Sequence, residues 1–362
     1  MATSVTDLLG VRMDELMRVT IERGASDLHM CVGLPPMLRI DGRLTPTEFP
    51  KLTPDEMKKL VYSILTDAQK ERFEKNLELD FSHGLKGFGR FRINAFKQRG
   101  VIGSVLRAIP STVPPLSSLN LPPVMADLVA RPHGLILVTG PTGSGKSTAL
   151  ASMVDVINQT MARHILTMED PIEYLHYHKM SMVNQREIGH DSYSFANALR
   201  AALREDPDVV MVGEMRDMDT IATTLTIAET GHLVFATLHT SDAAQTIDRI
   251  VDVFPSHQQQ QIRVQMASVI EAVVCLRLLP HASGVGRVPA AEVMIATPAI
   301  RNLIRENKTH QIHNAIVTSR IMHMQTFDMS LRDLVRKHMI TAEEALNASM
   351  HPEELRKLIE GV

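Results

Sequence analysis

Cysteine is scarce in this sequence, and long apolar runs are absent from it. Among 362 residues only Cys31 and Cys275 are cysteines, too few for a disulfide framework or for a zinc site made of four thiolates. No stretch approaches the roughly 18 apolar residues of a membrane-spanning helix. These absences argue against a small disulfide-rich secreted protein and against a membrane-spanning one. We expect a soluble protein of a reducing, cytoplasmic compartment.

The sequence also lacks an excess of charge of either sign. The 38 Lys and Arg residues against 41 Asp and Glu residues give a formal net charge of -3, which does not indicate a nucleic-acid-binding protein. The average hides a basic strip, because no acidic residue occurs between Asp80 and Asp127 and residues 86–107 hold six Lys and Arg residues. Any anion-binding site must therefore be local.

A proline-rich segment divides the chain. Five prolines among serines in residues 110–123 favour extended backbone and indicate a linker. Upstream of it, a short helix that stops at Gly24, a tight turn at Asp41 and Gly42, and a helix that begins at Thr53 predict a small mixed α/β domain. The predicted limits are an N-terminal domain at 1–110, a linker at 111–124, an α/β core at 125–290 and a helical C-terminal region at 291–362.

Four unbroken apolar runs recur in the core, beginning at residues 135, 164, 209 and 233, with helical segments between them. Strands that are buried on both faces of a parallel sheet have this pattern. We therefore predict a wound α/β domain whose strands deliver their carboxyl ends to one edge, where ligands bind.

The first of these runs leads into a phosphate-binding loop. Residues 140–147, GPTGSGKS, match the G-x-x-x-x-G-K-[ST] pattern, and a strand precedes and a helix follows, as the motif requires. Backbone N–H groups and the helix N-terminus favour a phosphate, Lys146 should reach the β- and γ-phosphates, and the Ser147 hydroxyl should bind Mg²⁺. The predicted ATP-binding residues are Gly140, Thr142, Gly143, Ser144, Gly145, Lys146, Ser147 and Thr148.

The other three strands end in polar residues that could act on the phosphates. Glu214 could polarise the attacking water, with Mg²⁺ bound to it directly or through water, and Glu169 is a second candidate for the same work, so their division of roles stays open. His239 could hydrogen-bond the γ-phosphate with His232 in support. His232 follows Gly231, however, and fits equally well as a residue at the end of a helix.

Together these motifs resemble the secretion-type hexameric ATPases of type IV pilus and type II secretion systems. The phosphate loop, the acidic segment ILTMEDPIEY at 165–174, the strand that leads to Glu214 and the segment GHLVFATLHT at 231–240 occur in the order of that family. Within it, AIRNLIRENK at 299–308, GASDLHM at 24–30 and MQTFDMSL at 324–331 resemble the pilus retraction ATPases. The match runs nearly from end to end.

The resemblance implies a PAS-like N-terminal domain, a RecA-like ATPase core and a homohexamer with ATP between one core and a neighbour's N-terminal domain. It implies work at the cytoplasmic face of the bacterial inner membrane on a PilC-like platform protein, driving pilus retraction and twitching motility, with a PilU-type paralogue as a further partner. A PilU-type role, or that of another type II/IV secretion ATPase, stays an alternative. Assembly enzymes typically carry a four-cysteine zinc module, which the two cysteines argue against.

The resemblance also suggests a purpose for the basic strip. Arg92, Arg99 and Arg107 are candidates for arginines that reach a neighbour's triphosphate. In the simpler interpretation, GRFRINAF is a half-buried strand with a solvated arginine face. A nucleic-acid groove would need Phe91 exposed as a stacking platform, and period-two alternation places it inside, so we expect no nucleic-acid partner.

Overall fold

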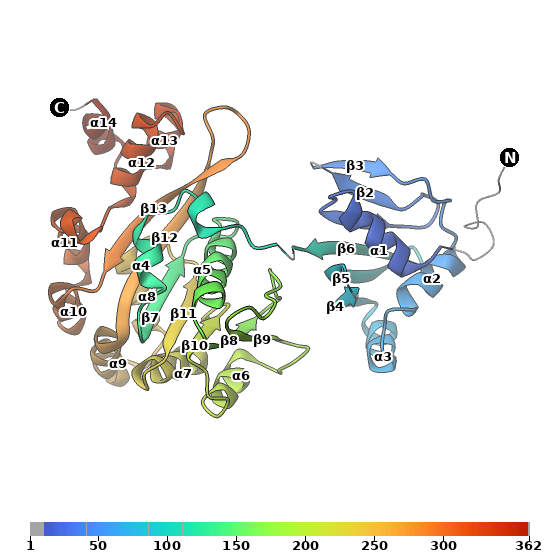
Figure 1. Ribbon diagram of the computed structural model, residues 1–362, viewed down its shortest axis with the longest axis horizontal. Coiled ribbons are helices and arrows are strands. Elements are labelled where there is room, and N and C mark those ends of the chain that lie inside the picture. The colour runs from blue at the N-terminus through green and yellow to red at the C-terminus, as the bar shows by residue number, and fades with distance from the viewer. Residues whose placement is uncertain (1–10, 41, 86, 111, 361–362) are drawn as a thin grey trace. The chain divides into compact units, whose positions relative to one another are not determined.

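The computed structural model describes residues 11–360 except 41, 86 and 111, and the chain divides into two compact units (Figure 1). One unit comprises Met1–Thr112 with Glu173–Leu175, and the other comprises Val113–Ile172 with His176–Val362. Several predicted features lie outside the described residues. They are residues 1–10 of the predicted N-terminal domain, the turn residue Asp41, residue 111 at the start of the predicted linker, and residues 361–362 of the predicted helical region.

Within its described part, the first unit is a six-stranded antiparallel sheet in the order β3-β2-β1-β6-β5-β4. The alternation predicted for β5 is present, since Phe91 and Ile93 are fully buried and Arg92 is exposed. The buried face packs against the helices, so the opposite face carries the arginines. The elements are α1 (Met13–Glu22), β1 (Asp27–Met30), β2 (Met37–Ile40), β3 (Arg43–Pro46), α2 (Pro54–Tyr62), α3 (Asp67–Asn76), β4 (Glu78–Leu85), β5 (Gly89–Gln98) and β6 (Val101–Ile109).

The described part of the second unit is built on a seven-stranded sheet in the order β13-β12-β7-β11-β10-β8-β9. Every neighbouring pair is parallel except β12 with β13, so the predicted wound α/β core is confirmed. Its elements are α4 (Val124–Leu128), β7 (Gly134–Thr139), α5 (Lys146–Thr160), β8 (His164–Glu169), β9 (Met182–Glu187), α6 (Phe195–Ala202), β10 (Val209–Val212), α7 (Met218–Glu229), β11 (Leu233–Leu238), α8 (Ala243–Asp252), α9 (Ser256–Val269), β12 (Ile270–Pro280) and β13 (Arg287–Ile295).

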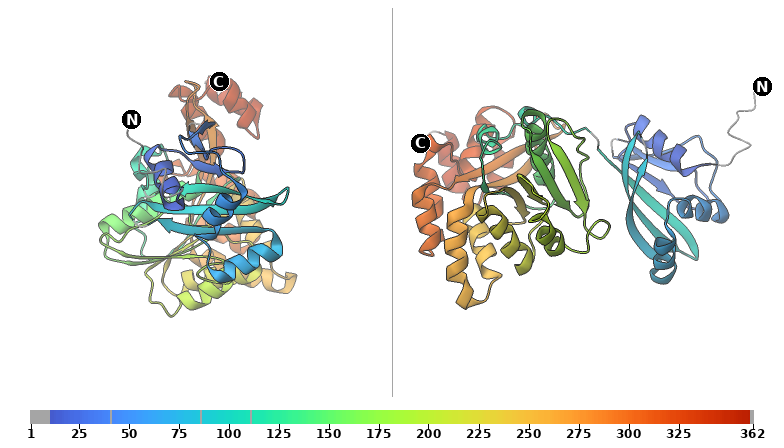
Figure 2. Two further views of the ribbon diagram at one scale, coloured as in Figure 1. Left: turned by 90° about the vertical axis from the view of Figure 1, so that its right-hand side faces the viewer. Right: turned by 60° about the horizontal axis from the view of Figure 1, so that its bottom comes forward.

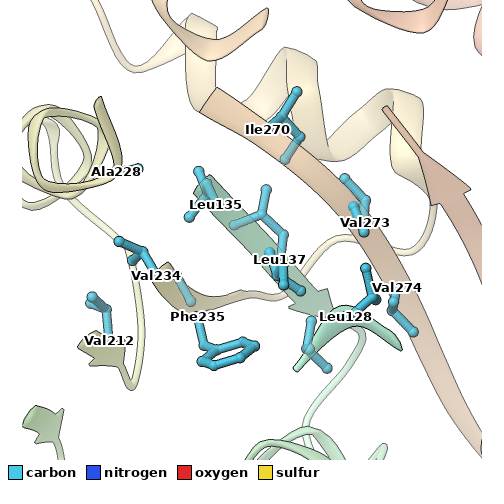
Figure 3. Close-up of a cluster of buried hydrophobic side chains, with 14 of the residues drawn as sticks. Leu128, Leu135, Leu137, Val212, Ala228, Val234, Phe235, Ile270, Val273 and Val274 are labelled. Carbon is cyan, nitrogen blue, oxygen red and sulfur yellow. The ribbon is translucent and has the colours of Figure 1, made fainter. Parts of the chain in front are cut away.

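Helices cover both faces of this sheet, with α5 on one side and α6 to α9 on the other (Figures 1 and 2). Right-handed crossovers require this, because the chain moves across the sheet in one direction through α5 and in the other through the later helices. The strands are consequently buried on both faces: Leu137, Val234 and Val273 from three of them form an apolar layer on one face, and Phe235, the neighbour of Val234, points to the opposite face (Figure 3). That layer holds the strand ends, and so the site, in fixed register.

Two predicted boundaries differ from the structure. The helical region does not begin at residue 291, because β13 continues the sheet to Ile295 as the antiparallel partner of β12. Most of the predicted linker belongs to the second unit, which begins at Val113. Leu116, in a short 3₁₀ helix, and Leu121 both pack against the core of that unit. The C-terminal helices are α10 (Pro298–Arg305), α11 (Ile312–Thr318), α12 (Phe327–Arg336), α13 (Ala342–Ala348) and α14 (Pro352–Glu360).

Candidate functional site

The phosphate loop joins the end of β7 to the start of α5. Gly140, Gly143 and Gly145 all have positive φ angles, of 138°, 78° and 93°. A Cβ atom at Gly140 would lie only 2.2 Å from the carbonyl oxygen of Leu276 on β12, so this position has no room for a side chain. The glycines let the loop curl over the N-terminus of α5, whose unpaired N–H groups favour an anion.

Two side chains in the loop indicate that it is shaped for phosphate. Lys146 is buried, and its Nζ donates to the carbonyl oxygens of Gly140 at 2.7 Å and Pro141 at 3.0 Å. Burial lowers the pKa of the Lys146 ammonium, and the negative charge of Glu214 opposes that shift. The Ser144 hydroxyl is buried and has no hydrogen-bond partner among the described residues. A phosphate oxygen would supply the acceptor that this hydroxyl lacks.

The remaining loop residues are more open. Thr142, Gly143 and Ser147 are exposed, and Thr148 lies half-buried in the first turn of α5. The exposed Ser147 hydroxyl is therefore available as an oxygen ligand, which is the kind of ligand that Mg²⁺ prefers.

The carboxyl ends of β8 and β10 lie side by side. Val212 of β10 pairs with Met168 of β8, and the next residue, Gly213, donates its N–H to the Met168 carbonyl oxygen at 2.7 Å. A Cβ at Gly213 would lie 3.0 Å from that same oxygen, so the two strand ends approach closely. This contact brings the backbone segments that carry Glu169 and Glu214 together at the edge where the phosphate loop begins.

Glu214 lies at the centre of a small polar cluster. Its Oε1 is 3.0 Å from His239 Nε2 and also accepts a hydrogen bond from Arg216. Burial disfavours the charged carboxylate, but the Arg216 hydrogen bond and the charges of His239, Arg216 and Lys146 together hold the pKa of Glu214 below its ordinary value. Glu214 is therefore an ionised carboxylate beside the phosphate loop and keeps part of its side chain open to water.

Glu169 differs from Glu214 in its surroundings. It is 6% exposed, and its Oε1 accepts hydrogen bonds from Thr167 Oγ1 at 2.8 Å and from Gln185 Nε2 at 3.1 Å. A carboxylate held in this way is less free to bind water than Glu214. The two acids, which the sequence could not separate, thus have different environments.

His232 does not lie at this edge of the sheet. The next residue, Leu233, pairs with Gly134 at the start of β7, whereas the phosphate loop follows Thr139 at the end of that strand. This places His232 about 20 Å from the phosphate loop along β11. Its Nδ1 lies 2.9 Å from the carbonyl oxygen of Ile227, so it caps the end of α7. The structure removes His232 from the candidate site of its own subunit.

The three candidate arginines all belong to the first unit. Arg92 on β5 and Arg107 on β6 are cross-strand neighbours on the arginine-bearing face, and Arg99 lies in the turn between these strands with a φ angle of 51°. Arg107 Nε donates to Asp27 Oδ1 at 2.9 Å, while its side chain stays largely exposed. Within the first unit these residues therefore form a solvated surface.

Sequence reasoning missed several residues of the second unit's site. Arg216 contacts Glu214, Gln185 contacts Glu169, and Thr237 donates its hydroxyl to the Gly213 carbonyl oxygen at 2.5 Å. Arg216 lies only two residues after Glu214, so the sequence alone could have indicated it. Gln185 and Thr237 come from other strands, and no local pattern links them to the acids.

Comparison with known proteins identifies the family of this chain. The family model described as "Type II/IV secretion system protein" matches residues 11–360. The type IV pilus retraction ATPase PilT of Pseudomonas aeruginosa is 50% identical over 339 residues, which cover 94% of this chain and 98% of that protein. The type IV pilus ATPase PilU of the same organism is 38% identical over 349 residues, which cover 96% of this chain and 91% of the relative.

A solved structure agrees with this assignment. The crystal structure of a pilus retraction motor PilT with bound ADP superposes with a TM-score of 0.89 at 51% identity, and the match covers 96% of this chain and all of that one. The phosphate loop, the polar strand ends and this end-to-end similarity lead to one conclusion: the chain belongs to the type II/IV secretion system protein family and, within it, to the pilus retraction ATPases.

Proposed function

We propose that this chain is the subunit of a hexameric motor that hydrolyses ATP to retract type IV pili and so powers twitching motility. The observation that carries the proposal is the meeting of a phosphate-shaped loop with an ionised carboxylate at one sheet edge. Lys146 and the orphaned Ser144 hydroxyl suit a bound triphosphate, and Glu214 beside His239 suits attack by water. The 50% identity to a pilus retraction ATPase supports the cellular role.

In the proposed reaction the loop residues hold and orient the phosphates. The N–H groups at the start of α5 and the Lys146 ammonium bind the phosphate oxygens, and the ammonium exchanges its two carbonyl acceptors for them. Ser147 and Glu214 would hold Mg²⁺, which would supply positive charge to the phosphates. These roles are electrostatic, as expected for phosphoryl transfer.

The two acids divide the remaining work. Glu214 is ionised and partly open to water, so it orients the water that attacks the γ-phosphorus and can accept its proton. His239 contacts Glu214 and is well placed to hydrogen-bond the γ-phosphate and report its loss. Glu169 already accepts hydrogen bonds from Thr167 and Gln185, which suits support of the neighbouring strand end rather than activation of water.

The arginine-bearing face of the first unit completes the proposed site in a ring. Arg92 is exposed and free of acidic neighbours on β6, where it faces Arg107. Arg107 already pairs its Nε with Asp27, so part of its charge is neutralised within its own subunit. We therefore place Arg92 first among the three arginines as a group that acts on the next subunit's ATP, where it would neutralise developing charge.

The proposed partners follow from the family. A PilC-like platform protein would attach the ring to the cytoplasmic face of the inner membrane, and a PilU-type paralogue would act beside it. In the described part of the chain no helix has both the length and the apolar character needed to cross a bilayer. Attachment through a protein partner agrees with that finding.

The test of the enzymatic proposal is ATP hydrolysis by the purified ring with and without Mg²⁺. We expect turnover in the wild type, and its loss in Lys146→Ala and Glu214→Gln. Glu229→Gln is the matched control, because Glu229 ends α7 at the opposite sheet edge and contacts Gln265. Full activity of a clean Lys146→Ala, Glu214→Gln double variant would refute the site. Stimulation by single-stranded DNA would instead indicate a nucleic-acid motor.

The cellular role is tested by deleting the gene and observing labelled pili. Loss of retraction that returns with the wild-type gene and not with Lys146→Ala would support the retraction motor. Normal retraction, in a strain without a paralogue that substitutes, would overturn this role. Retraction that is weakened rather than lost would favour the accessory PilU-type alternative.

A further inference from the structure

Glu292 connects the ATPase core to the C-terminal helices. It lies on β13 opposite Cys275 of β12 and is 5% exposed. Its Oε1 accepts the N–H of Ala243, the first residue of α8, at 2.8 Å, and the carboxylate also accepts the N–H of Phe327, the first residue of α12. One carboxylate thus accepts a backbone hydrogen bond from the first residue of each of two helices, where negative charge is favoured.

A short segment links Glu292 to the candidate catalytic acid. Residues 239–243 begin at His239, which contacts Glu214, and end at Ala243, which contacts Glu292. Within the segment, the Thr240 hydroxyl bonds the Thr246 hydroxyl at 2.7 Å, which ties it to α8. A shift of His239 when the γ-phosphate leaves would therefore be transmitted to the α8 end that Glu292 holds.

The space around Glu292 allows such a shift. A cavity of about 450 Å³ lies between the core and part of the C-terminal helices, and its lining includes Pro141 of the phosphate loop, Glu292, Ile312 of α11 and Phe327 of α12. Besides Glu292, its titratable and charged lining groups are Cys275 and Arg277 of β12, Asp242 before α8, His313 of α11, Asp328 of α12 and His351 before α14.

Both charge states of Glu292 are accessible near neutral pH. Burial raises the pKa of Glu292 to about 7, the charges of Asp242 and Asp328 act in the same direction, and the two backbone N–H groups oppose them. Protonation removes the negative charge that favours both helix ends and weakens the acceptor that both N–H groups share.

We propose that Glu292 is a positioning residue for ATP hydrolysis: ionised, it holds the starts of α8 and α12 against β13, and protonated, it stays buried on β13 but binds their N–H groups more weakly and lets the two helix starts move. Its charge state thereby sets how firmly the segment 239–243 is tied to the C-terminal helices. We call the two hydrogen bonds from Ala243 and Phe327 to Glu292 the clamp. The inference rests on the proposed ATPase function for its catalytic consequence, whereas the clamp itself depends only on the residues around the cavity.

The clamp can be measured by fluorescence. The chain has no tryptophan, so a Phe327→Trp substitution provides a single reporter at the start of α12. We expect its emission to change between pH 6 and 8 with a midpoint near 7, and this transition to disappear in Glu292→Gln. Glu343→Gln is the matched control, because Glu343 is an exposed acid in the first turn of α13. It should leave the midpoint unchanged.

A second variant distinguishes a clamp from a merely structural residue. Asp328→Asn removes a charge that keeps Glu292 protonated, so the midpoint should move to lower pH, and the pH dependence of kcat for ATP should move with it. An emission transition that persists in Glu292→Gln would assign it to His313 or His351 and overturn the proposal. A midpoint unchanged in Asp328→Asn would do the same. A wild type without hydrolysis would refute the proposed function, while the fluorescence titration would still decide the clamp.

Discussion

A Gly140→Ala substitution should damage both the stability of the second unit and its affinity for ATP. The φ angle of Gly140 is +138°, and an added Cβ would lie 2.2 Å from the Leu276 carbonyl oxygen and 2.7 Å from the Ser144 hydroxyl. Backbone strain of this kind costs about 1–3 kcal/mol. Forcing Leu276 and β12 away from the loop adds about 1–3 kcal/mol, as overpacking does in other cores.

Gly231→Ala separates the two contributions. Gly231 has a φ angle of +99°, but nothing lies within 4 Å of its Cβ position, and it precedes His232 at the edge opposite the phosphate loop. This variant should carry the strain alone and bind ATP normally. Gly140→Ala should melt lower than Gly231→Ala by roughly 2–4 °C for each kcal/mol of steric cost.

Titration of each variant with a fluorescent ATP analogue gives the second readout. If the loop must deform by about 1–3 kcal/mol to admit the methyl group, Gly140→Ala should bind about ten- to hundredfold more weakly than the wild type. Wild-type affinity in Gly140→Ala, together with a melting temperature equal to that of Gly231→Ala, would refute the close approach of the loop to β12.

Three further predictions follow from other parts of the second unit. Phe235→Ala should cost about 3–5 kcal/mol, measured by urea unfolding, because the ring is fully buried; an unchanged midpoint would contradict that packing. Arg301→Ala should cost about 1.5–3 kcal/mol, since its guanidinium donates to Glu271 and to backbone carbonyls that anchor α10, and rescue by Arg301→Lys would count against this multidentate role. Glu292 holds a proton in the folded protein between pH 4.5 and about 7 that the unfolded chain has lost. The unfolding free energy of the wild type should therefore fall by up to about 3 kcal/mol relative to Glu292→Gln as the pH rises through that window, and parallel curves would contradict it.

Local patterns were enough for the parts of this protein that depend on neighbours in sequence. The phosphate loop at 140–147 was visible because the backbone that binds phosphate is built from consecutive residues. The buried parallel strands were visible because burial on both faces leaves unbroken apolar runs such as 209–212. Fold class and family could therefore be predicted from the order of the amino acids alone.

Predictions failed where a residue's role depends on a distant segment. The last part of β13, residues 291–295, falls in the predicted helical region because its strand partner, β12, is not evident from the sequence. His232 and His239 both belong to the segment 231–240, so the sequence pattern groups them. They lie at opposite ends of the six-residue strand β11, however, and only His239 is at the end where the phosphate loop begins.

The sequence by itself determined the phosphate chemistry, the α/β class and the family, because each of these depends on contiguous motifs and their order. Only the tertiary structure decided which acid is open to water, Glu214 or Glu169, because His239 and Gln185 must first be brought to these carboxylates from other strands. It alone also revealed Glu292, since a carboxylate acquires an unusual charge equilibrium only from the burial and the neighbouring charges that folding supplies.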